Sequence, residues 1–250
     1  MRLHDRLVNF TLSLILALVP CVEAQVVRIP GVGGTAPGGV AAITHIADAV
    51  EASTATGTVT SGTLNVLAGD KIIAMCRSGG SANTITLTST GGDSPSYTTH
   101  ETDGNIGNTQ IAYIGNAAAN ASDAFTCNFT GSPGGRDIIV MQFRGGLTSS
   151  ILDTQLQGAI GSTTATLTTG SFSTATGNEV IALCGGNDSN NNVYAAGAIG
   201  GTTATLSTAS PIQDLGCEYL ITTVTQTSIT ATMTTTTTTP HWNWQMGAFK

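Results

Sequence analysis

From residue 43 onward, apolar and polar residues alternate in short runs, separated by turn-forming residues at intervals of roughly ten positions. A period of two places successive side chains on opposite faces of a strand, and many short strands at this spacing are typical of an antiparallel β-sandwich. The first group of expected strands covers residues 57–66, 71–76, 84–89, 110–114, 124–129 and 138–143. The second group covers residues 163–169, 179–184, 202–207, 217–223, 228–234 and 242–249.

The composition supports the same fold class. Only 9% of the 250 residues are charged and 40% are hydrophobic, while Thr, Gly and Ala are abundant. β-Branched residues favour the pleated surface of a sheet over a helix, and long runs of helix-forming residues are missing from the chain. We therefore predict an all-β protein with one β-sandwich domain over residues 43–250.

The two groups of strands resemble each other in sequence. The segment GDKIIAMCRSGG matches GNEVIALCGGND, so that Cys76 and Cys184 lie 108 positions apart and are expected to superpose. The segment DIIVMQFR matches NWQMGAFK with an offset of 106, which places Phe143 near Phe249.

Half-repeats at about 58–145 and 162–250 therefore predict one pseudo-symmetric domain, in which each half contributes strands to both sheets. The alternative is two independent sandwiches of about 100 residues each. The join at residues 145–161 argues against this alternative, because it is short and contains apolar residues.

Several strand motifs together resemble a family of uncharacterised secreted bacterial modules. They are an apolar GD-x-[IV]-[IV] strand, a later Tyr strand, an [IV]-[VM]-x-F-[RK] strand that leads to an LDT turn, and a final W-x-M-x-A-F-K. The resemblance covers residues 58–250 and implies a jelly-roll, concanavalin-like sandwich. It implies no catalytic residue.

The N-terminus has the pattern of an export signal. Arg2 and Arg6 precede an apolar stretch at residues 7–19, and Ala24 ends a small-residue cleavage site. The stretch is shorter than the ~20 residues that a spanning helix needs, so we expect no membrane span. Residues 1–24 are thus predicted to be a signal peptide and 25–42 a Gly/Pro-rich leader or linker of a secreted, extracellular or cell-surface protein.

The charge pattern disfavours one class of partner. The formal net charge is −7, and the basic residues beyond the signal are few and scattered. Such a surface cannot neutralise a run of phosphates, so we expect no nucleic-acid binding.

Four cysteines remain after the signal, and an even number in an exported chain permits two disulfides. Burial as small apolar residues is the other interpretation, and both stay open. If the cysteines are bridged, we favour pairs within each half, Cys76 with Cys127 and Cys184 with Cys217. No CxxC pair is present, which disfavours a zinc site.

Two polar loops are the candidate ligand sites. The first loop carries Asp93, Glu101 and Asp103, and the second carries Asn187 and Asp188. Such oxygen-rich side chains can accept hydrogen bonds from sugar hydroxyls or hold a Ca²⁺ ion, for which the metal ligands would include Glu101 and Asp103. Ordinary turn chemistry explains these residues equally well.

One aromatic residue is a further candidate for ligand binding. Trp242 begins the last expected strand beside a proline, where an open ring could stack on a sugar. The alternative for both tryptophans of this strand is burial in the core.

No catalytic residue is assigned, and we do not expect an enzyme. The mature chain lacks a G-x-S-x-G nucleophile elbow. A glycosidase would need two carboxylates at a set separation, and the pair Glu179 and Glu218 is the candidate that the sequence leaves.

Two functions remain in view. The first is a non-catalytic extracellular binding or adhesion module, with a glycan or cell surface as its partner. The alternative is a self-assembling filament or matrix subunit, in which the N-terminal segment adds as a strand to a neighbour's sheet edge.

Overall fold

The computed structural model describes residues 40–53, 57–80, 84–103, 107–131, 134–160, 165–187, 192–207, 214–236 and 241–250. Every regular element in these ranges is a β-strand, which confirms the all-β prediction. Residues 40–250 form one compact unit. The expected signal peptide at 1–24 and nearly all of the 25–42 leader lie outside the described residues.

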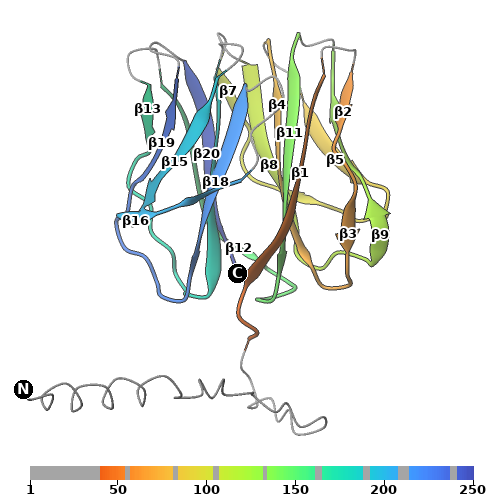
Figure 1. The fold of residues 1–250 in the computed structure, drawn as a ribbon, viewed down its shortest axis with the longest axis horizontal. Helices are drawn as coiled ribbons and strands as arrows, with labels where there is room; N and C mark the ends of the chain where they lie inside the picture. Colours follow the sequence, from red (N-terminus) through yellow and green to blue (C-terminus); the bar gives the residue numbers. More distant parts are fainter. Residues whose placement is uncertain are drawn as a thin grey trace, which may run out of the picture. The chain divides into compact units, whose positions relative to one another are not determined.

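Five antiparallel pairings build the first large sheet, which we call the N-terminal inner sheet (Figure 1). Its strand order is β1-β11-β4-β8-β6, and β7 pairs with β8 beside β6. The strands are β1 (Thr44–Ser53), β4 (Lys71–Ser78), β6 (Ser96–Tyr97), β7 (Glu101–Asp103), β8 (Gly107–Ile114) and β11 (Arg136–Arg144).

Two smaller sheets cover one face of this inner sheet. They are β2-β10-β5 and β3-β9, formed by β2 (Thr58–Thr60), β3 (Leu64–Val66), β5 (Ile85–Ser89), β9 (Asn120–Asp123) and β10 (Phe125–Phe129). Buried side chains from both layers, among them Val59, Ile72, Phe125 and Val140, form a core between them. We call these strands together the N-terminal sandwich.

The rest of the chain repeats this layout as a C-terminal sandwich. Its inner sheet has the order β12-β20-β14-β18-β17, and its outer sheet the order β13-β19-β15-β16. Its strands are β12 (Leu152–Ile160), β13 (Thr166–Thr168), β14 (Glu179–Asn187), β15 (Tyr194–Ile199), β16 (Thr202–Thr203), β17 (Thr205–Leu206), β18 (Leu215–Thr222), β19 (Ala231–Thr235) and β20 (Trp242–Phe249). Leu167, Leu183, Met233 and Trp244 belong to its core.

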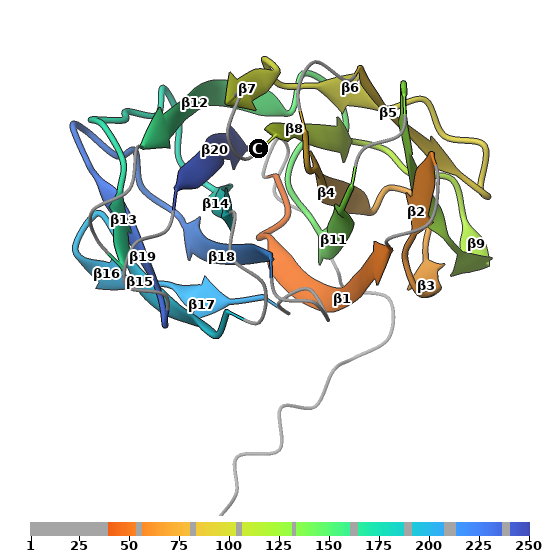
Figure 2. The same cartoon turned by 90° about the horizontal axis from the view of Figure 1, so that it is seen from above.

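The two inner sheets pack against each other, so that four layers lie side by side (Figure 2). A third apolar cluster fills the space between them and includes Met75, Met141, Ala182 and Phe249. Strands β4, β11, β14 and β20 are therefore buried on both faces. This explains why they read as continuous apolar runs, which is the pattern of strands covered on two sides.

Polar side chains also join the inner sheets. The Asn243 amide donates to Gly107 O at 2.9 Å and accepts from the Thr109 hydroxyl at 2.6 Å. Arg77 donates to Asn187 O at 2.6 Å and to Asp137 in its own sandwich at 2.9 Å. Because buried polar groups are costly unless they are paired, these contacts fix the register of one sheet on the other.

The expectation that each half contributes strands to both sheets of one sandwich was wrong. Each sheet of the described chain draws its strands from one half only. Each half also has its own core. The apolar residues of the join, which argued against two sandwiches, have another role: Leu152 and Leu156 belong to strand β12, and Ile151 packs in the cluster between the inner sheets.

The expected superposition of Cys76 on Cys184 also differs from the structure. Phe143 pairs with Lys71, whereas Phe249 pairs with Val180, so the strand pairing is shifted by one residue relative to the sequence match. A shift of one residue turns a side chain to the other face of a sheet. Cys76 accordingly lies in the N-terminal core and Cys184 in the cluster between the inner sheets.

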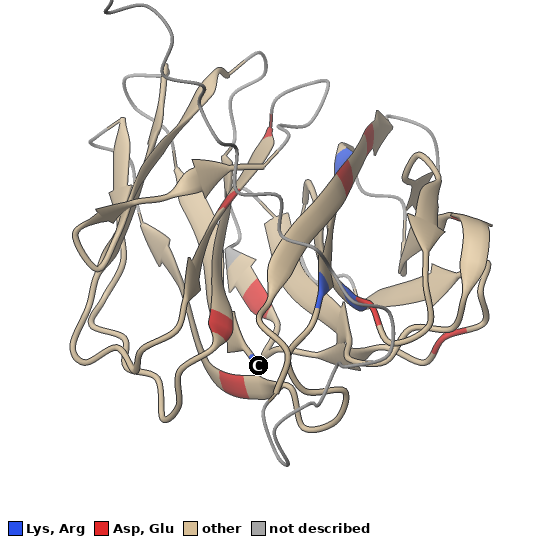
Figure 3. Ribbon diagram, turned by 60° about the horizontal axis from the view of Figure 1, so that its bottom comes forward, with Lys and Arg blue, Asp and Glu red and all other residues tan. Residues whose placement is uncertain are grey.

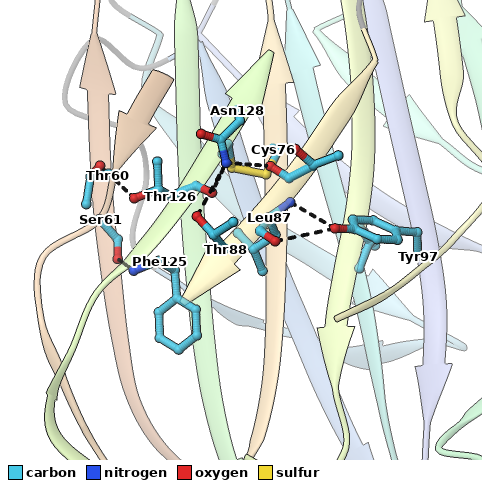
Figure 4. Close-up of a disulfide and its surroundings, with 12 residues drawn as sticks. Thr60, Ser61, Cys76, Leu87, Thr88, Tyr97, Phe125, Thr126 and Asn128 are labelled. Carbon is cyan, nitrogen blue, oxygen red and sulfur yellow. Dashed lines mark hydrogen bonds between the residues drawn. A yellow bond between two sulfur atoms is a disulfide. The ribbon is translucent and has the colours of Figure 1, made fainter. Parts of the chain in front are cut away.

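Both disulfides expected within the halves are present. Cys76 bonds Cys127 and thereby joins the inner sheet to the outer sheet of the N-terminal sandwich (Figure 4). Cys184 bonds Cys217, its direct partner on the neighbouring strand. Two disulfides are compatible with an extracellular protein.

Threonines form rows on the solvent face of the N-terminal outer sheet. Thr60, Thr126 and Thr88 lie side by side on three strands, and the first two share a hydrogen bond of 2.8 Å. The Asn128 amide donates to Thr88 (Figure 4). The alternating apolar side chains of the same strands face the core, so strand propensity accounts for the repeated Thr pattern.

Candidate functional site

A pocket of about 370 Å³ lies at the seam between the two sandwiches. Ser96 and Tyr113 line it from the N-terminal inner sheet, and Leu152 lines it from the C-terminal inner sheet. The segment that connects the sandwiches supplies the remaining wall through Thr148, Ser149, Ser150 and Ile151, and Gly115 completes the lining.

The backbone of the connecting segment shapes this pocket. Gly145 and Gly146 have φ values of 95° and 71°, and Ser150 has a φ of 50°, which is uncommon for a residue with a side chain. Gly115 allows the segment to approach closely, because a Cβ at this position would lie 2.7 Å from the Ile151 side chain. Lys250 holds the segment from the other side through its backbone N–H, which donates to Ile151 O at 2.7 Å near the C-terminus (Figure 1).

The lining combines an aromatic ring with several hydroxyl groups. Tyr113 is half-buried and packs against Phe249 with ring centroids 5.4 Å apart. Ser96, Thr148, Ser149 and Ser150 are exposed. A ring that is fixed by packing and flanked by hydroxyls offers one apolar surface and several hydrogen-bonding groups to a small polar ligand.

The first predicted loop does not form one cluster. Asp93 accepts a hydrogen bond from Ala118 N at 2.9 Å, beyond the end of β8. Glu101 instead pairs with Thr109 near the start of β8. The five residue steps from Thr109 to Ile114 span about 17 Å of strand, so Asp93 and Glu101 lie toward opposite ends of the sandwich. Asp103 ends β7, and its ligand role remains a prediction.

The second predicted loop is only partly described. Asn187 is fully buried: its amide donates to the Tyr194 hydroxyl at 2.9 Å and accepts from the Asn192 amide at 2.6 Å. Its backbone carbonyl accepts from Arg77. These contacts give Asn187 a structural role at the seam, while Asp188 lies outside the described residues.

Trp242 is buried rather than open. Its side chain is 1% exposed and packs in the C-terminal core, where Tyr194 meets it edge-on with ring centroids 6.0 Å apart. The interpretation of Trp242 as an exposed ring for sugar stacking is therefore corrected. The expected open face is absent because the last strand is central in its sheet and covered on both sides.

A calcium or other metal site receives no support from the described part of the chain. No three His, Cys, Asp or Glu side chains come together in it as a metal site would require. His100, which directly precedes Glu101, is half-buried. Burial lowers the pKa of His100 because the charged imidazolium is disfavoured away from water.

The two carboxylates considered for a glycosidase bond to different parts of the C-terminal sandwich: Glu179 accepts from the Thr176 hydroxyl and Glu218 from Gly197 N–H. Glu179 pairs with Thr222, and Glu218 pairs with Leu183. Because Leu183 lies four residues after Glu179 on β14, the backbone positions of the two glutamates are about 13 Å apart along the strands. Glycosidases hold their two carboxyl groups within about 10 Å of each other. Glu218 is also fully buried, which raises its pKa to about 7.

The sequence did not identify the pocket residues. The pattern places Tyr113 only within an expected strand at 110–114, and it indicates residues 145–161 only as a join between the halves. The segment GGLTSS at residues 145–150 indicates a loop, because Gly, Ser and Thr are typical of connections, but it does not indicate a pocket. Whether this segment lines a pocket depends on which strands it packs against in the folded protein, and the sequence pattern does not give that packing.

Comparisons with protein-family models, with curated proteins and with solved structures find no match for this chain. Among the described residues, no helix is long and apolar enough to cross a membrane.

Proposed function

We propose that this chain is a non-catalytic extracellular binding module that binds carbohydrate in the pocket at the seam of the two sandwiches. The observation that carries the proposal is the lining of this pocket, in which the Tyr113 ring lies among exposed Ser and Thr hydroxyls. Sugar rings combine apolar C–H faces with many hydroxyls, and such a lining complements both.

The surrounding scaffold supports a binding role. Tyr113 packs on Phe249, and Ile151 belongs to the apolar cluster between the inner sheets, so these parts of the pocket wall need little ordering when a ligand binds. The pocket lining contains no carboxylate, histidine or cysteine that could act as an acid, base or nucleophile. An adhesion role would follow if the ligand is part of a cell surface or matrix.

A glycan array followed by calorimetric titration tests the proposal. The change Ser96→Arg places a bulky side chain at an exposed position of the pocket lining. We expect the affinity for the glycan selected by the wild type to fall about tenfold or more, a change of about 1.4 kcal/mol in binding free energy.

The matched control is Ser122→Arg, which introduces the same side chain at an exposed serine on β9, outside the pocket lining. It should bind as the wild type does. Equal binding by Ser96→Arg and the wild type would remove this pocket from consideration.

A second candidate function rests on the edge of the N-terminal inner sheet. Within the described chain, β1 pairs with β11 on one side and ends the sheet on the other, and an edge strand can accept a further strand. The Gly/Pro-rich leader immediately precedes β1 and could add to the edge of a neighbouring copy. Electron microscopy with light scattering tests this self-assembly: filaments formed by the mature chain, but not by a chain that begins at residue 40, would favour it.

The finer fold assignment is also a proposal. We propose that the two sandwiches are jelly-roll-type repeats of the secreted bacterial family that the sequence resembles. Their matching strand orders support this interpretation.

A further inference from the structure

Three basic residues adjoin or bond the segment that connects the two sandwiches, and the side chain of each already has a partner. The Lys71 ammonium donates to Gly145 O. The Arg144 guanidinium donates to both carboxylate oxygens of Asp70, at 2.7 and 2.9 Å. The third, Lys250, forms an ion pair with Asp153 at 3.3 Å.

The pair between Lys250 and Asp153 is closest to the pocket in the chain. Asp153 follows the lining residue Leu152, and the backbone of Lys250 is bonded to the lining residue Ile151. The Asp153 side chain is 5% exposed and that of Lys250 is 20% exposed, so the pair is shielded from water. Burial raises the pKa of Asp153, but hydrogen bonds from Ala175 N–H and Lys250 outweigh this and hold it below its ordinary value.

An acidic ligand would therefore find no available counter-charge. The pocket lining itself contains no Lys or Arg. Arg144 and Lys250 are paired with carboxylates, and Lys71 is fully buried with its ammonium bonded to Gly145 O. A carboxylate or sulfate entering the pocket would lose hydration without gaining an ion pair, which is unfavourable. The net charge of −7 adds long-range repulsion (Figure 3 shows the scattered charges).

We propose that the pocket is specific for neutral sugars, and that Asp153 sets this specificity by holding the Lys250 ammonium in an ion pair. This inference rests on the proposed carbohydrate-binding function. It names the ligand class as an uncharged hexose or its glycoside and excludes uronic acids, sialic acids and sulfated sugars. Tyr113 and the Ser and Thr hydroxyls supply the contacts, since a neutral ring requires no cation.

Calorimetric titration of the mature chain with methyl glucoside and methyl galactoside, and with the corresponding methyl uronides, tests the proposal. For each hexose that binds, the wild type should bind its uronide at least about tenfold more weakly, or not at all. Equal or tighter binding of the uronide would overturn the specificity. Failure of all neutral sugars to bind, on the array and in titration, would instead overturn the proposed function on which it rests.

The variant Asp153→Asn tests the role of Asp153. The loss of the Asp153 charge releases the Lys250 ammonium. The ratio of hexose affinity to uronide affinity should therefore fall severalfold, while the hexose affinity itself stays nearly unchanged. The matched control is Glu51→Gln, which also removes one negative charge, on β1, and should leave this affinity ratio unchanged. An equal effect of both variants would show that net charge, not Lys250, decides.

A second variant keeps the proposal testable if Asp153→Asn does not fold. Ser149→Lys adds an ammonium group at an exposed position of the pocket wall. It should improve uronide binding relative to hexose, and the gain should decline as salt screens the pair. If neither variant lowers the ratio of hexose affinity to uronide affinity, the selectivity has another origin and the proposal fails.

Discussion

Glu218 is the clearest case of a buried ionisable residue in this protein. Its side chain is fully buried, and Gly197 N–H donates to its Oε2 at 2.7 Å. Gly197 lies where the pairing of β15 with β19 is irregular, so Glu218 satisfies a backbone donor that the sheet leaves over. Burial raises the pKa of Glu218 to about 7, because the charged carboxylate is disfavoured there.

The stability of the protein should therefore depend on Glu218 in a defined pH range. The folded protein holds this proton more tightly than the unfolded chain, whose carboxyl has the ordinary pKa of 4.5. The residue's contribution is most favourable below pH 4.5, and stability is lost as the pH rises toward 7. In Glu218→Gln this loss should disappear, which urea unfolding at pH 5 and pH 8 would measure.

The exposed residue Glu51 provides the control for that experiment. Glu51→Gln should keep the wild-type loss of stability between pH 5 and pH 8. A Glu218→Gln protein with the same pH dependence as the wild type would show that Glu218 does not titrate in this range.

At the level of single residues, the sequence could not decide between exposure and burial for Trp242 and Asn187. Both lie on strands of an inner sheet that is covered on two sides. Alternation predicts one solvent-facing side for each strand, and this rule fails where a second sandwich packs against the sheet. The cysteine pairing was predictable because each pair lies within one half.

At the level of elements, the prediction missed the shorter strands β6, β7, β9 and β15 as well as two long edge strands, β1 and β12. Both are long, but they contain Ala, Gly and polar residues and are mostly half-exposed. An edge strand needs fewer apolar residues than a central one, so its periodicity is weak. The central strands β4, β11, β14 and β20 were all found, and the last of them was predicted at its observed bounds.

The two disulfides tie different kinds of elements. Cys76 and Cys127 join strands of two separate sheets, whereas Cys184 and Cys217 join strands already paired by a hydrogen-bonded ladder. Their sequence separations are 51 and 33 residues, which corresponds to a loop-entropy contribution of about 4 kcal/mol each.

We predict that the double variant Cys76→Ala/Cys127→Ala loses more stability than Cys184→Ala/Cys217→Ala. Loop length alone makes the two losses of stability differ by less than about 1 kcal/mol. The hydrogen-bonded ladder between β14 and β18 still joins the strands when Cys184 and Cys217 are replaced, and this increases the difference. Urea unfolding of both double variants measures the two losses. A larger loss in the Cys184/Cys217 variant would contradict this view of the elements.

At the level of the whole molecule, the repeat in the sequence identified two related halves but not how they combine. Each half-repeat already contains the strands of an inner and an outer sheet, so it can close its own core. The inner sheets then bury their second faces on each other, with Met75, Ile111 and Ala182 among the contacts. This back-to-back packing creates the seam, and the pocket exists only because the connection crosses that seam.

The central claim is that the ligand site lies at this seam and not in the polar loops of the strand ends. A crystal structure of the mature chain with the neutral glycan selected on the array tests it most directly. We expect density for a sugar ring against Tyr113, with its hydroxyls near Ser96 and residues 148–150. A sugar bound instead beside Glu101, at the start of β8, or on an outer sheet would contradict the account.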